Sequence, residues 1–278
     1  HGRGKEMEST RRAWVGEDMV LSGVDLNFNG WGAKYPHSRD RKVALGICRL
    51  SGARRVTTDL ILEGGGIEMD GRGTVMVTES NMFHPKRTKG LEKPTAENKA
   101  RVARELKRLF GATKVIWLPG LRTPGDCTDG HVDAFARFTE VPGVVVVHRE
   151  DSKEAAYKPE YEATRRHIDI LESSRDALGN PFSVIALPGP STSRKPPKGG
   201  KIEEACFSYA NFYIANGAVF CPEFGDPKAD KRALEILQKA FPSRKVIQLN
   251  IDGVAYGGGG IHCVTQQQPD ASCVSQQW

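Results

Sequence analysis

Alternating apolar and polar side chains first appear along the chain at Met19. Such alternation is typical of a half-buried strand, and it predicts one over 20–28 that runs into a turn at 29–32. Residues 1–18 are charged and show no apolar period, so we expect a poorly determined leading segment anchored by Trp14.

Helical periodicity then alternates with short apolar runs. Glycines at the ends of several helical segments are typical helix terminators. The predicted helices lie around 43–48 and over 95–110, 159–178 and 227–241, and the strands that follow them are 55–62, 114–118, 183–187 and 245–249. Further strands are predicted over 74–78, 144–147, 207–214 and 218–221.

These elements form a strand, helix, strand unit that recurs about four times, with a period of roughly 55 to 70 residues. The pattern predicts a single α/β domain over 1–278, with a flexible loop at 188–201 as a candidate lid. Motifs around Glu63, His131 and Cys263 each follow the strand that comes after a helix. In a circular arrangement, those strand ends would converge on one central point.

The composition permits an enzyme and argues against several other classes. The net charge is +6 over 278 residues, but lysine and arginine alternate with acids, and no basic block with interleaved aromatics indicates a nucleic-acid surface. No apolar run is long enough to span a membrane. The chain begins with His1, so a removed leader or a missing amino-terminal part stays open.

The six cysteines are dispersed and never closely paired as in zinc or redox motifs. This spacing suits a reducing, cytoplasmic location. One of them, Cys263, follows the glycine run 257–260, which allows close approach to a ligand and a presented sulfur. Taken alone, this stretch is better interpreted as a glycine turn before a core cysteine.

Two motifs upstream favour a catalytic role for Cys263 over a structural one. Within 129–133, His131 and Asp133 are two residues apart and are expected on one side of an extended stretch. Glu63 stands at a strand end beside two glycines. A metal site with Cys127, His131 and Asp133 as ligands is a weaker alternative because a second histidine is lacking, and we expect no metal.

A cysteine, a histidine and two carboxylates at equivalent strand ends indicate nucleophilic catalysis on a planar cation. A guanidinium fits, because its fork of donors pairs with carboxylates such as Asp133 and Glu63 while a thiolate attacks the central carbon.

These motifs, together with those at 28–32 and 211–217, resemble the agmatine deiminases of the wider bacterial-type peptidyl-arginine deiminase family, from about residue 20 to 269. The resemblance implies a pentein fold, which is a five-bladed α/β propeller with its active site on the pseudo-fivefold axis. It also implies conversion of agmatine to N-carbamoylputrescine and ammonia without a cofactor, and a possible homodimer.

The resemblance further implies residue roles. Cys263 would be the nucleophile that forms an amidino-cysteine, and His131 would transfer protons. Asp133 would bind the guanidinium, and Glu63 would support the histidine. Substrate binding would fall to Trp31, Asp129 and Gly260.

The sequence also departs from the family pattern. The family's Trp-x-Arg-Asp-x-Gly-Pro element, whose aspartate is a second guanidinium clamp, has here only the segment 14–18, in which Asp18 is the nearest acid. Cys127 stands where glutamate is common. One blade is expected to be incomplete, and we expect low or absent turnover for the chain as given.

Three alternatives stay open. The substrate could be peptidyl-arginine or free arginine, or the chain could be a non-catalytic pentein that binds a guanidinium compound. Nucleotide binding ranks last, because no P-loop lysine follows the glycine run.

Overall fold

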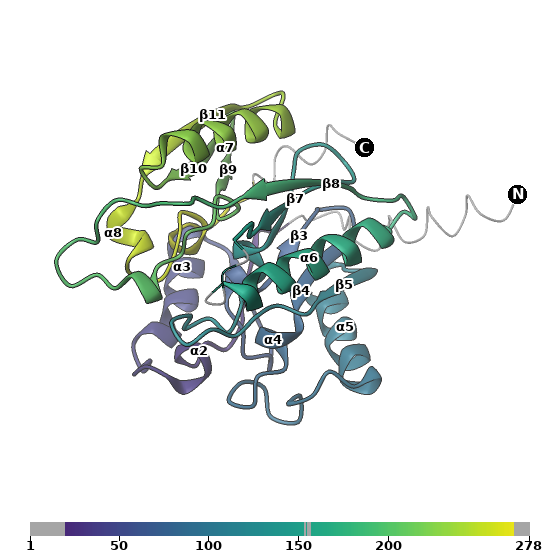
Figure 1. Cartoon of the computed structure of the whole chain (residues 1–278). Helices are drawn as coiled ribbons and strands as arrows, with labels where there is room; N and C mark the ends of the chain where they lie inside the picture. The colour runs from purple at the N-terminus through teal and green to yellow at the C-terminus, as the bar shows by residue number, and fades with distance from the viewer. Residues whose placement is uncertain (1–19, 153, 155–156, 270–278) are drawn as a thin grey trace, which may run out of the picture.

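The computed structural model describes residues 20–152, 154 and 157–269, which form an α/β fold with four small sheets (Figure 1). Three sheets have three strands each, and the fourth has two. The predicted Trp14 anchor and Asp18 lie outside the described residues. No helix in the described ranges is long and apolar enough to cross a membrane.

Each sheet belongs to one segment of the chain, and each segment repeats the same order. A helix connects two parallel strands, as expected because parallel neighbours require a crossover. The units are β1 (Ser22–Asp25), α3 (Val43–Ser51) and β2 (Arg54–Thr57); β3 (Glu68–Met69), β4 (Thr74–Thr78), α5 (Ala96–Phe110) and β5 (Lys114–Leu118); β6 (Ala136–Phe138), β7 (Val144–Arg149), α6 (Lys158–Ser173) and β8 (Ser183–Pro188); and β9 (Tyr213–Ala215), β10 (Ala218–Glu223), α7 (Pro227–Ala240) and β11 (Lys245–Asn250). The recurring unit predicted from the sequence is therefore present four times.

In three of the units, an antiparallel strand precedes the middle strand and completes the sheet. These strands are β3, β6 and β9, paired with β4, β7 and β10. Among the described residues, the β1–β2 sheet has no such third strand. Short elements fill the connections: α2 (Gly30–Ala33), α4 (Glu79–Met82) and α8 (Asp252–Ala255), and 3-10 turns at Asp40–Lys42, Gly64–Gly66, Val132–Ala134, Ile202–Glu204 and His262–Val264.

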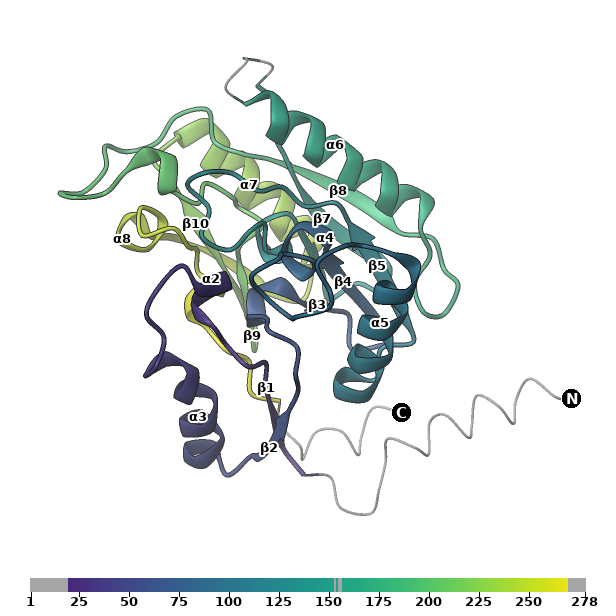
Figure 2. The ribbon, with the colours of Figure 1, turned by 90° about the horizontal axis from the view of Figure 1, so that it is seen from below.

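The four long helices lie on the outside of the molecule, around the strands (Figure 2). Three of them bury an apolar face against the sheets, for example Val102 and Leu106 of α5 and Leu237 of α7. The helix α3 differs. Its buried residue is Cys48, whereas Ile47 is 49% exposed and Leu50 is 87% exposed.

A buried ion pair joins two of the sheets, and its arginine also contacts the segment that leads into β9. Arg137 in β6 donates from Nε to Glu68 in β3 at 2.8 Å and from Nη1 to the carbonyl of Phe212 at 2.5 Å. Its guanidinium also lies over the Phe212 ring, 4.7 Å from the centroid. The other carboxylate oxygen of Glu68 accepts from the backbone of Phe138 at 2.9 Å. Each charge is thus paired and hydrogen-bonded, as a buried charge requires.

Several predicted boundaries were wrong. The helix predicted over 159–178 ends at Ser173, because the Asp176 carboxylate accepts from the backbones of Leu178 and Asn180 and forms a turn there. The strand predicted over 55–62 ends at Thr57. Of the strand predicted over 207–214, only Tyr213 and Ile214 belong to β9.

The loop 188–201 is anchored at several points. Asp226 accepts from the backbones of Ser191 and Thr192 at 3.1 and 3.3 Å. Arg194 donates to Asp252 at 2.7 Å and to the carbonyl of Glu223 at 2.6 Å. The flexibility expected of this loop stays a prediction.

Candidate active site

Four loops, each following the last strand of one unit, meet in a single polar cluster. The loop after β2 carries Glu63, and the loop after β5 carries His131 and Asp133. The loop after β8 carries Asn211, and the loop after β11 carries Cys263. Because these strands occupy the same position in each unit, the repeat of the fold explains why residues far apart in sequence come together.

Cys263 lies in the short 3-10 turn His262–Val264. The residue is exposed, while its sulfur lies 3.6 Å from Asp133 Oδ2 and 3.4 Å from the side-chain nitrogen of Asn211. Desolvation and the Asp133 carboxylate raise the pKa of the thiol, and hydrogen bonds from the Gly260 backbone and Asn211 oppose that rise. Without further positive charge, the sulfur therefore stays protonated.

Asp133 is fully enclosed and uses only one of its oxygens. Oδ2 accepts from His262 Nδ1 at 2.8 Å. Oδ1 is buried and has no hydrogen-bond partner in the described part of the chain. Burial alone would raise the pKa of this carboxyl, but the His262 hydrogen bond and the nearby His131 and His262 charges lower it. An ionised carboxylate with a bare buried oxygen fits a ligand that brings a donor.

His131 is buried and hydrogen-bonded through Nε2 to Glu63 Oε2 at 2.8 Å. Burial disfavours the imidazolium, but the hydrogen bond and charge of Glu63 outweigh it and raise the pKa of His131. Burial by itself would raise the pKa of Glu63, because it disfavours the charged carboxylate. The His131 and Arg87 interactions outweigh it and lower the pKa of this carboxyl. The pair therefore favours an imidazolium beside a carboxylate.

Arg87 holds the carboxylate of Glu63 that is hydrogen-bonded to His131. Its buried guanidinium contacts both Glu63 oxygens, one of them at 2.6 Å. It also donates to the carbonyl of Thr128 at 2.9 Å and to Asp129 Oδ2 at 3.2 Å. This fork joins the loop after β2 to the loop after β5.

Gly65 allows the histidine and the aspartate to pack against the backbone. A Cβ at this position would lie 2.6 Å from Asp133 Oδ2 and 2.7 Å from His131 Nδ1. Any side chain would push both groups away. The glycines beside Glu63, noticed in the sequence, thus make room for the two residues opposite.

The three predicted substrate-binding residues lie in different surroundings. The Asp129 carboxylate accepts from Lys34 at 2.6 Å and from Arg87, so both of its oxygens are occupied. Trp31 packs edge-on against Phe28, with ring centroids 4.9 Å apart. Gly260 lies against Asn211. That these residues bind substrate stays a prediction.

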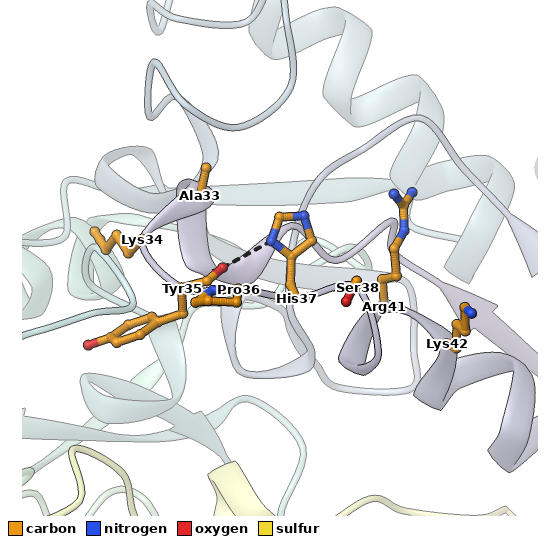
Figure 3. A pocket seen from close by; sticks show the side chains of 8 residues that line it. All are labelled: Ala33, Lys34, Tyr35, Pro36, His37, Ser38, Arg41 and Lys42. Carbon is orange, nitrogen blue, oxygen red and sulfur yellow. Dashed lines mark hydrogen bonds between the residues drawn. The ribbon is translucent and has the colours of Figure 1, made fainter.

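An open hollow of about 700 Å³ lies along the segment that follows Trp31 (Figure 3). Its lining consists of residues 33–38 together with Arg41 and Lys42, and it contains none of the proposed catalytic side chains. In Figure 3, the His37 ring turns toward the carbonyl of Tyr35, a contact of 3.0 Å. The polar cluster around Cys263 is therefore the better candidate site.

The weaker metal interpretation gains no support from the geometry. Within the described ranges, no three histidine, cysteine or acidic side chains are grouped so as to hold an ion. Cys127 instead presents its backbone carbonyl to Lys34 at 2.8 Å.

One local prediction for the site was wrong, and three contributors were missed: Arg87, Asn211 and His262, the histidine that holds Asp133. Residues 132–134 form a 3-10 turn rather than an extended stretch. Arg87 gave no sequence signal, because it lies in a loop with no recognisable motif. Asn211 belongs to a segment that carried the family resemblance, but no role was assigned to it.

The chain matches a known protein family and resembles several of its members. Residues 10–269 match the family model of Porphyromonas-type peptidyl-arginine deiminases. The chain is 37% identical to the agmatine deiminase of Pseudomonas aeruginosa, over 94% of this chain and 75% of that protein. It is 36% identical to that of Medicago truncatula, over 90% and 69%. Its structure is similar to that of the agmatine deiminase of Enterococcus faecalis, with a TM-score of 0.77 and 33% identity over 89% and 70% of the two chains.

Proposed function

The chain belongs to the family of Porphyromonas-type peptidyl-arginine deiminases, and on that premise we propose that it hydrolyses agmatine to N-carbamoylputrescine and ammonia. It is a hydrolase that acts on carbon–nitrogen bonds of linear amidines. The relatives and the solved structure described above are named as agmatine deiminases, which favours agmatine over arginine or peptidyl-arginine.

The observation that carries the proposal is the bare oxygen of Asp133. Asp133 Oδ1 is buried without a partner in the described part of the chain, and Oδ2 of the same carboxylate is 3.6 Å from the Cys263 sulfur. A guanidinium N–H donated to this carboxylate would hold the central carbon next to the sulfur. The cation would also favour the thiolate that the empty site disfavours.

The proposed reaction then proceeds in two steps, attack on the guanidinium with loss of ammonia and hydrolysis of the amidino intermediate. The thiol proton leaves to solvent, and the Cys263 thiolate attacks the guanidinium carbon to form a C–S bond. The C–N bond breaks, and His131 gives its proton to the departing ammonia. The neutral His131 next takes a proton from water, whose oxygen attacks the amidino carbon. The C–S bond breaks, which restores the Cys263 thiolate, and the ureido product leaves after its remaining O–H proton passes to solvent.

Glu63 and Arg87 support the histidine without contacting the reacting atoms in this proposal. Glu63 stabilises the imidazolium that the first step requires, and Arg87 holds the Glu63 carboxylate in place. Both effects are electrostatic and depend on burial, since charges interact more strongly away from water.

Product analysis tests this proposal directly. The chain is incubated with agmatine, arginine and a benzoyl-arginine peptide, and ureido products are detected by mass spectrometry, which needs only a few turnovers. Although we expect a low turnover for this chain, we expect detectable product from agmatine, none after Cys263→Ala, and no change after Cys48→Ala, which removes a thiol in α3 outside the site. A folded sample that gives no product from agmatine would contradict the proposal.

The fold is of the α/β pentein type, and its finer architecture belongs to the proposal. We infer a five-bladed propeller around the site, to which the described residues contribute four units. The two-stranded β1–β2 sheet supports an incomplete blade at this position. The homodimer and the cytoplasmic location also stay predictions.

A further inference from the structure

The side-chain amide of Asn211 lies against the sulfur of the proposed nucleophile. Its nitrogen Nδ2 is 3.4 Å from Cys263 Sγ, within the range of a hydrogen bond to sulfur. Asn211 is buried, with 1% of its surface exposed. The contact is therefore buried on the Asn211 side, whereas Cys263 itself is exposed.

The orientation of the amide follows from a second contact. The backbone nitrogen of His262 lies 3.0 Å from Asn211 Oδ1. A backbone N–H can only donate, so the Asn211 atom that it meets is the carbonyl oxygen. The nitrogen of the amide is then the group left to donate to the sulfur.

The backbone around the site is shaped for this amide. A Cβ on Gly260 would overlap the Asn211 side chain. The Asn211 backbone carbonyl also lies 3.3 Å from the nitrogen of His262, which holds the two loops together. Glycine at position 260 thus lets the loop after β8 reach the loop after β11.

A donor at this place has a clear electrostatic purpose. The Asp133 carboxylate lies 3.6 Å from the sulfur and repels a negative charge there. Among the described groups, the Asn211 amide and the Gly260 backbone oppose this effect and lower the pKa of the thiol. The attack on substrate needs the negative sulfur, and so does its departure from the amidino intermediate.

We propose that Asn211 is a catalytic residue that donates a hydrogen bond to the Cys263 thiolate, both during attack and when the C–S bond breaks. The proposal rests on the deiminase function argued above. It assigns to the loop after β8 a direct part in the chemistry.

The test measures the reactivity of the thiolate without substrate. Iodoacetamide is added at a fixed pH below the thiol pKa, and alkylation of Cys263 is followed by peptide mass spectrometry. Asn211→Asp keeps the oxygen that accepts from His262 but replaces the donor by a carboxylate. We expect its alkylation rate to fall by roughly 10- to 100-fold, the effect of losing one hydrogen bond to a charged group.

Asn216→Asp is the matched control, because it adds the same charge in the exposed turn between β9 and β10. It should be alkylated at the rate of the unchanged protein. Circular dichroism and the thermal midpoint check the fold of each variant. If Asn211→Asp does not fold, Asn211→Ala carries the test, with a fall of roughly 10-fold expected.

Equal alkylation rates for a folded Asn211 variant and the Asn216→Asp control would overturn the proposal. Agmatine turnover is measured on the same samples, so that the two claims can fail separately. A protein that is alkylated normally but makes no ureido product would contradict the function and leave the role of Asn211 to be decided by the alkylation rates.

Discussion

At the scale of single residues, the site is built from groups that shift one another's protonation. Glu63 holds His131 through a 2.8 Å hydrogen bond, and Arg87 holds Glu63. The reaction uses His131 first as an acid. The upper pH limit of activity should therefore follow the pKa of this histidine.

Replacing Glu63 tests this link. The Glu63 carboxylate raises the pKa of His131, so Glu63→Gln should lower that pKa, and the imidazolium is then lost at a lower pH. The alkaline limb of the kcat profile should move downward by about one pH unit or more. An alkaline limb that stays in place in a folded, active Glu63→Gln variant would show that another group sets it.

The sequence pointed to some of these residues and not to others, for a physical reason. His131 and Glu63 stand next to glycines and Cys263 follows a glycine run by three residues, and the freedom of glycine to approach a ligand can be noticed in a linear sequence. Arg87 and Asn211 act through contacts with residues 24 and 52 positions away. Those contacts exist only once the units are folded against one another.

At the scale of elements, patterns that combine periodicity with end signals were predicted well. The helix α5 begins after Thr95, whose side chain accepts from the Asn98 backbone, and it ends before Gly111 in the left-handed conformation. Both features can be read from the residues. The segment 207–212 looked like a strand because it is apolar, but it is a buried loop that brings Asn211 to the site.

The helix α3 shows that apolar periodicity does not guarantee burial. Its spacing predicted a helix correctly, yet Leu50 is 87% exposed, whereas Leu106 of α5 is fully buried. This contrast gives a matched pair of substitutions. Leu106→Ala should cost about 2 to 5 kcal/mol of unfolding free energy, because it leaves a cavity.

Leu50→Ala should change that free energy by less than about 0.5 kcal/mol. Urea unfolding followed by circular dichroism measures both values. Similar losses in the two variants would contradict the contrast between an exposed Leu50 and a buried Leu106.

At the scale of the whole molecule, packing between units buries a histidine that affects how the protein responds to acid. His167 in α6 is fully buried, and its Nε2 accepts from the Gly120 backbone at 3.1 Å. Burial, with further contributions from His148 and Arg166, lowers the pKa of His167 from 6.5 to about 3. The folded protein therefore contains neutral His167, whereas the unfolded chain binds a proton below pH 6.5.

The stability associated with this histidine is fully present above pH 6.5 and is lost as the pH falls toward 3. At pH 5 the loss should reach about 2 kcal/mol relative to pH 7. His167→Gln should flatten the dependence of the urea midpoint on pH between 7 and 5. A variant with the same slope as the unchanged protein would assign the acid sensitivity to other groups.

The positional argument from the sequence concerned the whole molecule as well. Three motifs at equivalent strand ends were expected to converge, and the structure brings Glu63, His131, Asp133 and Cys263 into one connected cluster. Whether the sheets close into a ring around that cluster could not be predicted from the sequence, because only four units are recognisable in it.

The central claim is that Cys263 attacks an amidine carbon held at Asp133, and a haloacetamidine tests it most directly. The reagent carries the planar cation of the substrate and traps a nucleophilic thiolate. Intact-mass and peptide mass spectrometry should find one adduct, on Cys263, that excess agmatine slows and that Cys263→Ala abolishes. A folded protein with no adduct, or with label spread equally over Cys127 and Cys206, would contradict the account.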